Sequence, residues 1–257
     1  MSTLFNLSGK KAIITGSSRG IGKATAIRLA EHGSKVVITS RKIDACEEVA
    51  KEINDTYGSD TAIALACNIS DKDQLEKMHK DSIAWCGDID ILICNAAINP
   101  YFGPSINTPD SAFEQIMRSN VQSNFWLCNE VIPDMIKDKN GSIIIISSIA
   151  GLHGSSFLGT YAISKAADSQ LARNISVEYG RNNIRANCIS PGLIKTDFAR
   201  ALWENESILK ASTNRTALKR IGMAYEIAGA AVFLASEAGS FMTGQNIVID
   251  GGESEQS

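Results

Sequence analysis

The residues best suited to acid–base chemistry are Tyr161 and Lys165, which lie four positions apart. If this segment is helical, both side chains project from the same face. A tyrosine ordinarily has a pKa of about 10, and a positive charge about 4 Å away would lower that pKa by at most ~3 units. Tyr161 would then titrate closer to neutral pH, where general acid–base catalysis works best. The spacing alone is weak evidence, because a chain of this composition has roughly a 0.3 chance of containing one such pair.

A glycine-rich segment near the N-terminus has the composition of a phosphate-binding turn. It follows an apolar run and reads TGSSRGIG over residues 15–22, where a helix is expected to begin. Glycines allow positive φ and a close approach of pyrophosphate to the backbone, and a helix N-terminus offers unpaired N–H groups. Its place at the first strand-to-helix junction favours a dinucleotide, although the spacing is GxxxGxG instead of GxGxxG. The expected contacts are Gly16, Ser18, Arg19, Gly20, Ile21 and Gly22.

The end of the second expected strand indicates which dinucleotide binds. An acidic residue there would hydrogen-bond the ribose 2′-hydroxyl of NAD, whereas an arginine suits the 2′-phosphate of NADP. The chain has Ser40, Arg41 and Lys42 at this point and no carboxylate before Asp44. A guanidinium can bind phosphate through two hydrogen bonds, and Arg19 offers a second guanidinium in the glycine-rich turn. The sequence therefore predicts NADP(H) as the cofactor.

Apolar runs rich in β-branched residues alternate with helical patterns along the whole chain. Some runs are apolar throughout, such as the four isoleucines at 143–146, which is typical of strands buried on both faces of a parallel sheet. Strands are expected at 12–15, 35–39, 61–66, 89–94, 142–147, 185–189 and 246–249. Helices are expected at 22–32, 44–57, 72–85, 111–137, 159–179 and 225–236. This alternation predicts one α/β domain over residues 1–257, a Rossmann-type, doubly wound, parallel seven-stranded sheet with helices on both faces.

Composition excludes several other classes of protein. The chain has 257 residues, of which 44% are hydrophobic and 21% charged, and its formal net charge is −3. This charge argues against a nucleic-acid binder, which usually carries a basic excess, and no apolar run approaches the ~20 residues of a transmembrane helix. The six cysteines form no CxxC pair and no zinc-like cluster with histidine. We therefore expect reduced thiols in the core and no metal site.

Further polar residues follow the expected strands, near the crevice where open α/β sheets bind ligands. In chain order they are Asn95, Asn120, Ser148, Tyr161 and Lys165. With these residues, the chain resembles the short-chain dehydrogenase/reductase family over essentially its whole length. The matching motifs are TGSSRGIG at 15–22, Asn68-Ile69, CNAA at 94–97, Asn120-Val121, Ser148, YAISK at 161–165 and Pro191-Gly192. The chain departs from the family pattern where CNAA replaces the usual NNAG and where Asn68 replaces a frequent Asp.

The resemblance implies a role for each of these residues. Tyr161 would donate its proton to a carbonyl oxygen as hydride arrives from the nicotinamide, and Ser148 would hydrogen-bond that oxygen as an oxyanion-hole donor. Asn120 would hold a water of the proton relay, and Lys165 would also bind the nicotinamide ribose. The remaining implied cofactor contacts are Asn68, Ile69, Asn95, Ala96, Tyr161, Lys165, Pro191, Gly192, Ile194 and Thr196.

Two segments, residues 98–109 and 191–222, are too long to be simple connections, and long loops in compact domains are usually functional. In the family the second segment, at about 192–222, is a lid over the substrate. Its apolar residues would exclude water from hydride transfer, or alternatively pack into an oligomer interface. Candidates for the rest of the pocket are Tyr101, Phe102, His153 and Phe157.

These observations predict an NADP-dependent short-chain dehydrogenase/reductase that interconverts a ketone or aldehyde and its alcohol. The runs INPYFG at 98–103 and PGLIKTDF at 191–198 resemble the NADPH-dependent carbonyl and retinal reductase branch. We expect a cytoplasmic protein, because the chain ends in Glu-Gln-Ser instead of a peroxisomal Ser-Lys-Leu-like signal. We also expect a homotetramer, because the family is commonly tetrameric. The charge and the short apolar runs described above predict no nucleic-acid or membrane partner.

Three alternatives remain at this point. A 3-oxoacyl-thioester (acyl-carrier-protein) reductase would need cations at the pocket mouth, for which Lys137 and Lys139 are candidates, although Asp134 and Asp138 interleave with them. An NAD-linked secondary-alcohol dehydrogenase would differ in its cofactor. A catalytically idle nucleotide-binding protein would not need the complete set of site residues that this chain has.

Overall fold

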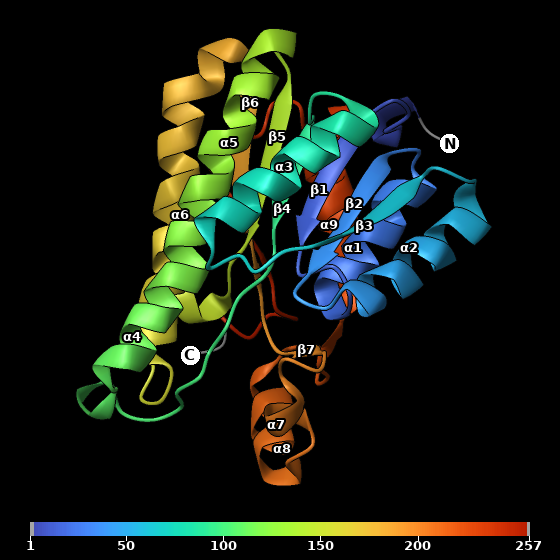
Figure 1. Cartoon of the computed structure of the whole chain (residues 1–257). Coiled ribbons are helices and arrows are strands. Elements are labelled where there is room, and N and C mark those ends of the chain that lie inside the picture. Colours follow the sequence, from blue (N-terminus) through green and yellow to red (C-terminus); the bar gives the residue numbers. More distant parts are fainter. Residues whose placement is uncertain (1–2, 256–257) are drawn as a thin grey trace.

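The computed structural model describes residues 3–255. Within this range seven parallel strands form one sheet in the order β3-β2-β1-β4-β5-β6-β9 (Figure 1). The order reverses between β1 and β4, which creates the crevice where doubly wound sheets bind ligands. The strands are β1 (Lys11–Thr15), β2 (Lys35–Ser40), β3 (Ala62–Ala66), β4 (Ile91–Cys94), β5 (Gly141–Ile146), β6 (Ile184–Pro191) and β9 (Asn246–Ile249). The prediction of a seven-stranded Rossmann-type sheet is confirmed.

Helices cover both faces of this sheet (Figure 1). One face carries α1 (Gly20–Glu31), α2 (Ile43–Tyr57) and α9 (Ala224–Ala235), and the other carries α3 (Lys72–Cys86), α5 (Ser123–Asp138) and α6 (Gly159–Tyr179). Shorter elements are α4 (Asp110–Ile116), the π-helical η3 (Met117–Gln122) and the 3₁₀ turns η1 (Thr3–Phe5), η2 (Ser105–Asn107), η4 (Ile149–Gly151), η5 (Gly180–Asn182) and η6 (Glu237–Gly239).

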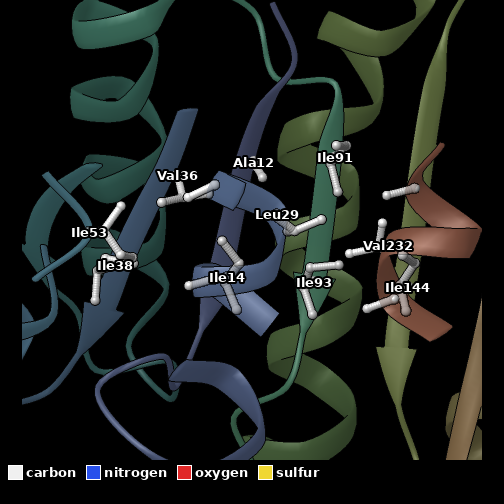
Figure 2. Packing of buried hydrophobic residues seen from close by; sticks show 14 of the residues in the cluster. Ala12, Ile14, Leu29, Val36, Ile38, Ile53, Ile91, Ile93, Ile144 and Val232 are labelled. Carbon is white, nitrogen blue, oxygen red and sulfur yellow. The ribbon is translucent and has the colours of Figure 1, made fainter. Parts of the chain in front are cut away.

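The isoleucine run of β5 shows why these strands are apolar throughout. Successive side chains of a strand point to opposite faces. Accordingly, Ile144 and Ile146 pack with α1, α2 and α9, whereas Ile143 and Ile145 pack with α3, α5 and α6. Figure 2 shows Ile144 beside Val232 of α9, within the first of these two cores. Each core therefore fixes the helices of one face, and both hold the carboxyl ends of the strands in register.

The structure differs from the expected helix at 111–137, which is divided into α4, η3 and α5. Within this turn the backbone carbonyl of Asn120 accepts a hydrogen bond from Nδ2 of Asn124 at 2.7 Å. A side chain thus takes the carbonyl that the backbone amide four residues later would use in a regular α-helix. Such π-helical turns occur frequently at functional sites.

The segment at 191–222 also contains more structure than expected. It includes β7 (Ile194–Lys195), α7 (Arg200–Trp203) and α8 (Glu206–Arg215), and it ends at β8 (Gly222–Met223). The strands β7 and β8 pair as a separate parallel ladder, and α7 and α8 project beyond the carboxyl edge of the main sheet (Figure 1). The other expected boundaries agree within two residues. The terminal motif expected at Gln256 and Ser257 lies outside the described residues.

Candidate active site

The glycine-rich turn connects β1 to the N-terminus of α1 and forms a tight cradle. Gly16 and Gly20 have φ values of +65° and +57°, a conformation that favours glycine. A Cβ at Gly22 would lie 2.4 Å from the carbonyl oxygen of Gly16 and 2.5 Å from Nδ2 of Asn95. The N-terminus of α1 has no side-chain cap, because the Arg19 side chain does not bond to it. Close backbone, positive φ and uncapped amides together fit a pyrophosphate group.

The end of β4 holds this cradle in shape. Nδ2 of Asn95 donates to the carbonyl oxygens of Thr15 at 2.8 Å and Gly16 at 3.1 Å. In return, Oγ1 of Thr15 accepts from the backbone N–H groups of Asn95 at 2.9 Å and Ala96 at 3.0 Å. The side chain of Asn95 is therefore engaged with the protein. The contacts of Asn95 and Ala96 with the cofactor stay predictions.

Cationic side chains lie at the end of β2 and in the turn. Arg41 and Lys42 are exposed and form no ion pair within residues 3–255, whereas Nη1 of Arg19 lies 3.7 Å from Oδ2 of Asp197. The Ser40 hydroxyl stays close to this turn and accepts from the backbone N–H of Lys42 at 3.4 Å. The charge at the end of β2 is thus available for an anion, which suits the 2′-phosphate of NADP.

The residue pair Asn68 and Ile69 follows β3 at the same carboxyl edge of the sheet. Oδ1 of Asn68 accepts from the backbone N–H of Ser70 at 3.2 Å, and the Asn68 backbone donates to the Gln74 side chain at 2.9 Å. Ile69 packs partly buried against the core. The proposed contacts of Asn68 and Ile69 with an adenine ring stay predictions.

Three of the four residues expected to take part in the chemistry lie just after β5 and on α6. Ser148 follows β5, and its hydroxyl accepts from the backbone N–H of Ala150 at 3.1 Å. Tyr161 and Lys165 lie one turn apart on α6, with the lysine Nζ 5.8 Å from the centroid of the tyrosine ring. Ser147 ties the two elements together, because its hydroxyl donates to the carbonyl oxygen of Lys165 at 2.8 Å.

The environment of Tyr161 changes one expectation. Burial raises the pKa of its phenol, and this effect outweighs the lowering of the pKa by Lys165. The carboxylate of Asp168 raises the pKa further, and the hydroxyl of Ser148 lowers it. The expected net lowering by Lys165 is therefore wrong for this arrangement, because that reasoning counted neither burial nor a second charge. The phenol is protonated at neutral pH and is a proton donor.

The side chain of Asn120 is fully buried and hydrogen-bonded to protein groups. Its Nδ2 donates to the carbonyl oxygen of Ile98 and to the hydroxyl of Ser164, both at 3.0 Å, and its Oδ1 accepts from the N–H of Ile98 at 2.9 Å. Both amide hydrogens of this side chain are thus used by protein groups, and Asn120 fastens the segment after β4 to α6. A water can still donate to an oxygen of this residue, so the expected relay water stays a prediction.

One residue at the site escaped the sequence reasoning. Asp168 is 1% exposed, and its Oδ2 accepts from Nζ of Lys165 at 3.0 Å. The lysine also donates to the carbonyl oxygen of Ile146 at 2.9 Å. Burial is the largest single effect and lowers the pKa of Lys165, but the charge and hydrogen bond of Asp168, together with Tyr161 and Cys188, raise it by more, so the ammonium stays charged. An acidic residue three positions after a lysine on a helix was the available signal.

The segment after β6 lies against the glycine cradle. Thr196 approaches Gly20 so closely that a Cβ on the glycine would lie 3.4 Å from the threonine Cγ2. Nε1 of Trp203 donates to the carbonyl oxygen of Thr196 at 2.7 Å, and Asp197 pairs with Arg19, as described above, and with Arg200. The phenylalanine that follows, Phe198, lies with its ring 6.2 Å from that of Tyr161. The segment at 192–222 thus lies over both the cradle and the tyrosine.

The start of this segment is held by the last strand. The backbone N–H of Gly192 donates to the carbonyl oxygen of Ile249 at 3.0 Å, and a Cβ on Gly192 would lie 2.8 Å from Cβ of Asp250. Pro191 ends β6, and Ile194 is buried at 5% exposure. The structure therefore brings these predicted residues to the edge that also holds the cradle.

Two aromatic side chains among the pocket candidates stack on each other. The rings of Phe102 and Phe157 are 5.6 Å apart and nearly parallel, and both side chains are more than half exposed. The hydroxyl of Tyr101 instead donates to the carbonyl oxygen of Pro104 at 3.1 Å, and His153 is exposed. An exposed aromatic pair beyond the catalytic residues suits an apolar substrate.

The lysines considered for an acyl carrier are misplaced for that role. Helix α5 ends at Asp138, shortly before β5 begins at Gly141, so Lys137 and Lys139 lie at the amino edge of the sheet. Nζ of Lys137 is also held 3.3 Å from both Asp88 and Asp134. The suggestion that these cations flank the pocket mouth is wrong, because the helix carries them away from the catalytic edge.

The chain as a whole matches known proteins. The family model described as enoyl-(acyl carrier protein) reductase matches residues 16–254. The chain is 37% identical over 247 residues to dehydrogenase/reductase SDR family member 4 of Bos taurus, which covers 96% of this chain and 88% of the relative. The chain belongs to the short-chain dehydrogenase/reductase family, a family of oxidoreductases that use a nicotinamide cofactor.

Two solved structures are similar over nearly the whole chain. A gluconate 5-dehydrogenase from Burkholderia cenocepacia in complex with NADP and tartrate has a TM-score of 0.94 and 31% identity, covering 99% of each chain. A 7α-hydroxysteroid dehydrogenase complexed with NADH and 7-oxo glycochenodeoxycholic acid has a TM-score of 0.93 and 36% identity, covering 98% of this chain and 97% of that one. These two neighbours were solved with different cofactors and with chemically different small molecules.

None of the helices within residues 3–255 combines the length and apolar character that crossing a membrane requires.

Proposed function

We propose that this chain is an NADP(H)-dependent oxidoreductase that interconverts a ketone or aldehyde and its alcohol. One observation carries the proposal: Tyr161, Lys165 and Ser148 lie at the carboxyl edge of the sheet, beside the glycine cradle and under the segment at 192–222. Reduction of the carbonyl is the proposed direction, and it rests on the proposed use of NADP(H). The exposed stack of Phe102 and Phe157 supports an apolar substrate.

The cofactor would supply the hydride, and the residues of the chain would supply everything else. The cradle from Gly16 to Gly22 would hold the pyrophosphate through backbone N–H groups, and Arg41 with Lys42 would bind the 2′-phosphate. Tyr161 would give its phenolic proton to the carbonyl oxygen. Ser148 would donate a hydrogen bond to the same oxygen and stabilise its developing negative charge.

The charge on Lys165 and the lid would assist this proton transfer. The ammonium of Lys165 favours the phenolate that forms when Tyr161 has given up its proton,. The segment at 192–222 would keep water away from the reacting carbon, since Phe198 lies against the tyrosine ring,. The side chain of Thr196, which packs on the cradle, is proposed to contact the nicotinamide end of the cofactor.

The mechanism is tested by the variant Tyr161→Phe with the absorbance of reduced nicotinamide as the readout. The panel of carbonyls would span short aldehydes, cyclic and aryl ketones, vicinal diketones, retinal and a 3-oxoacyl thioester. We expect turnover to fall on the order of 10²–10⁴-fold, while NADPH binding, followed by fluorescence, persists. The matched control is Tyr179→Phe, the same change at the other end of α6, which should keep wild-type turnover. Undiminished turnover in Tyr161→Phe would refute the mechanism.

The cofactor preference is tested by Arg41→Ala. A lost charged hydrogen bond costs about 1.5–3 kcal/mol, so NADPH affinity should fall about tenfold or more while NADH affinity changes little. Lys51→Ala, which removes an exposed cation farther along α2, is the control and should change neither affinity. Equal losses for both cofactors, or a wild-type preference for NADH, would favour the NAD-linked secondary-alcohol dehydrogenase.

The thioester reductase is the second candidate, and the description of the matching family model favours keeping it. Turnover of the 3-oxoacyl thioester alone would support it over the free carbonyls. The position of Lys137 and Lys139 at the opposite edge counts against docking of an acyl carrier there.

We further propose a cytoplasmic homotetramer. Apolar side chains on α5 and α6 support association through these helices, since Phe125, Ile163 and Val177 are at least half exposed, and solvent-exposed apolar patches often mark interfaces. Light scattering coupled to gel filtration tests the assembly, and a monomer at micromolar concentration would contradict it.

A further inference from the structure

The catalytic lysine is part of a buried charge pair that the proposed mechanism does not by itself require. The side chain of Lys165 is 2% exposed and that of Asp168 is fully buried. Taking two charges out of water is costly and is recovered only with good geometry and additional hydrogen bonds. A gain in stability therefore does not by itself explain why Asp168 is buried beside Lys165.

The hydrogen bonds of the pair fix the direction of the ammonium. Two of the three Nζ hydrogens of Lys165 are used, one by Oδ2 of Asp168 at 3.0 Å and one by the carbonyl oxygen of Ile146 at 2.9 Å. One hydrogen is left for other partners.

The carboxylate is itself held from the other side. Its Oδ1 accepts from Nδ2 of Asn124 at 3.1 Å, and the second hydrogen of that same nitrogen goes to the carbonyl oxygen of Asn120 at 2.7 Å. The π-helical turn at 117–122 thus frees the Asn120 carbonyl for a side chain, and the chain of bonds runs from this turn through Asn124 and Asp168 to Lys165. No member of the chain needs a solvent molecule.

We propose that Asp168 is a positioning residue, which keeps the Lys165 ammonium charged and directs its remaining hydrogen toward the site. The inference rests on the proposed function, since it gives the lysine its task beside Tyr161. Asp168 acts only through Lys165 and touches neither substrate nor cofactor.

The other titratable groups around Asp168 leave the lysine as its only counter-charge within the described residues. Tyr161 shares its helix, Cys188 faces it from β6 and Cys94 from β4, with Cys128 of α5 next to Cys94. Burial raises the pKa of the Cys188 thiol to about 12. A hydrogen bond with Cys128, together with burial, raises that of Cys94. These thiols are neutral at working pH, so Lys165 and Asp168 balance each other.

Removing the carboxylate charge leaves a buried cation beside Tyr161. The tyrosine–lysine pair then gives up its first proton at a lower pH, because loss of one positive charge or gain of one negative charge is now favoured. Whichever group loses that proton, the form in which Tyr161 can donate while Lys165 is charged disappears earlier as pH rises. Asp168→Asn should therefore move the alkaline limb of kcat for carbonyl reduction to lower pH by ~1–3 units.

The matched control is Ser169→Ala, on the next residue of α6. Ser169 is also buried and accepts a hydrogen bond from Asn246 at 3.2 Å, so its loss weakens packing of the same helix without changing charge. This variant should keep the wild-type alkaline limb. A limb in Asp168→Asn that stays at the wild-type pH, with only a lower kcat, would show a purely structural role and overturn the proposal.

A second measurement needs no substrate and separates this inference from the proposed function. Urea unfolding is compared for wild type, Lys165→Met, Asp168→Asn and the double variant. Each single change leaves one buried charge without its partner, whereas the double change leaves none. We expect each single variant to unfold at lower urea and the double variant to recover most of that loss. If Asp168→Asn alone does not fold, recovery of folding by the double variant supports the pair.

Additive losses in this cycle would overturn the proposal. If the wild type reduces no carbonyl of the panel, the proposed function fails, but the cycle still reports whether Asp168 holds the charge of Lys165. The two failures are therefore distinguishable.

Discussion

Gly22, inside the first turn of α1, is the position where a single methyl group should disturb the cofactor cradle most directly. Alanine is ordinarily favoured over glycine in a helix by about 0.5–1 kcal/mol. At Gly22, however, the new Cβ would lie 2.4 Å from the carbonyl oxygen of Gly16 and 2.5 Å from Nδ2 of Asn95. These two atoms are hydrogen-bonded to each other at 3.1 Å, so neither can move away without breaking the cradle.

Overpacking of this kind typically costs about 1–3 kcal/mol. Because the new Cβ meets backbone, the cost should lie in the upper part of this range, at about 2–3 kcal/mol, and subtracting the gain in helix propensity leaves an expected net loss of about 1–2.5 kcal/mol in the free energy of unfolding for Gly22→Ala. Affinity for NADPH should fall about tenfold or more, because the displaced carbonyl and amide shape the turn that receives the pyrophosphate.

The assay is urea unfolding followed by circular dichroism, with NADPH titration by fluorescence on the same preparations. Gly229→Ala is the matched control, since Gly229 lies within α9 and a Cβ there would meet nothing within 4 Å. That variant should gain about 0.5–1 kcal/mol and bind NADPH like the wild type. A Gly22→Ala variant as stable as the wild type, with unchanged affinity, would refute the reasoning.

Three further predictions concern pH, thiols and the lid. Arg220 lowers the pKa of Glu226 to about 2 from an ordinary 4.5, so the stability gained from the Glu226–Arg220 ion pair is present above pH ~4.5 and is lost as pH falls toward 2. In urea unfolding, Glu226→Gln should reduce the loss of stability between these pH values by about 1 kcal/mol, after allowance for solvent screening. A loss of stability in acid like that of the wild type would contradict this prediction. Cys86 is the one partly exposed cysteine of the six, and the other five are buried, so iodoacetamide should modify Cys86 first in the native protein. The reaction should be slow, because burial raises the pKa of this thiol to about 11. Mass spectrometry that shows a second thiol modified equally fast would disprove this prediction. Trp203→Phe removes the 2.7 Å hydrogen bond from Trp203 to the carbonyl oxygen of Thr196, at a cost of about 0.5–1.5 kcal/mol. Limited proteolysis within residues 196–221 should therefore be faster in the variant than in the wild type. Equal cleavage rates in the two proteins would show that Trp203 does not help to hold this segment in place.

Most of the fold could be predicted because its signals are local. The isoleucines of β5 report burial on both faces, and the strand-to-helix alternation then leaves one common topology. The strands β7 and β8 could not be predicted, since two residues are too few to show a period. The π-helical turn was equally hidden, because it depends on where the Asn124 side chain finds an acceptor in three dimensions.

The site was predictable in its residue types and less so in their environment. Spacing and order identify Tyr161 and Lys165, but the pKa of the tyrosine depends on burial, which a motif does not encode. Asp168 was missed because a carboxylate on a helix usually faces solvent, and only the packing of α6 against β5 and β6 makes it buried. The misplacement of Lys137 has the same origin, since the direction of α5 decides which edge it reaches.

The small ladder between β7 and β8 also lies between the segment at 196–221 and the core of the main sheet, so that the segment can change while the core stays the same. Ile194 pairs with Gly222 and Lys195 with Met223, so the two ends of the intervening segment are held side by side by one pair of strands. Insertions, deletions or whole replacements between residues 196 and 221 would begin and end at this same pair of strands. They would therefore leave β6, which precedes β7, and α9, which follows β8, in their present positions. Exchange of residues 196–221 at these two ends would therefore alter only the part of the proposed pocket that this segment forms and would leave the stack of Phe102 and Phe157 unchanged.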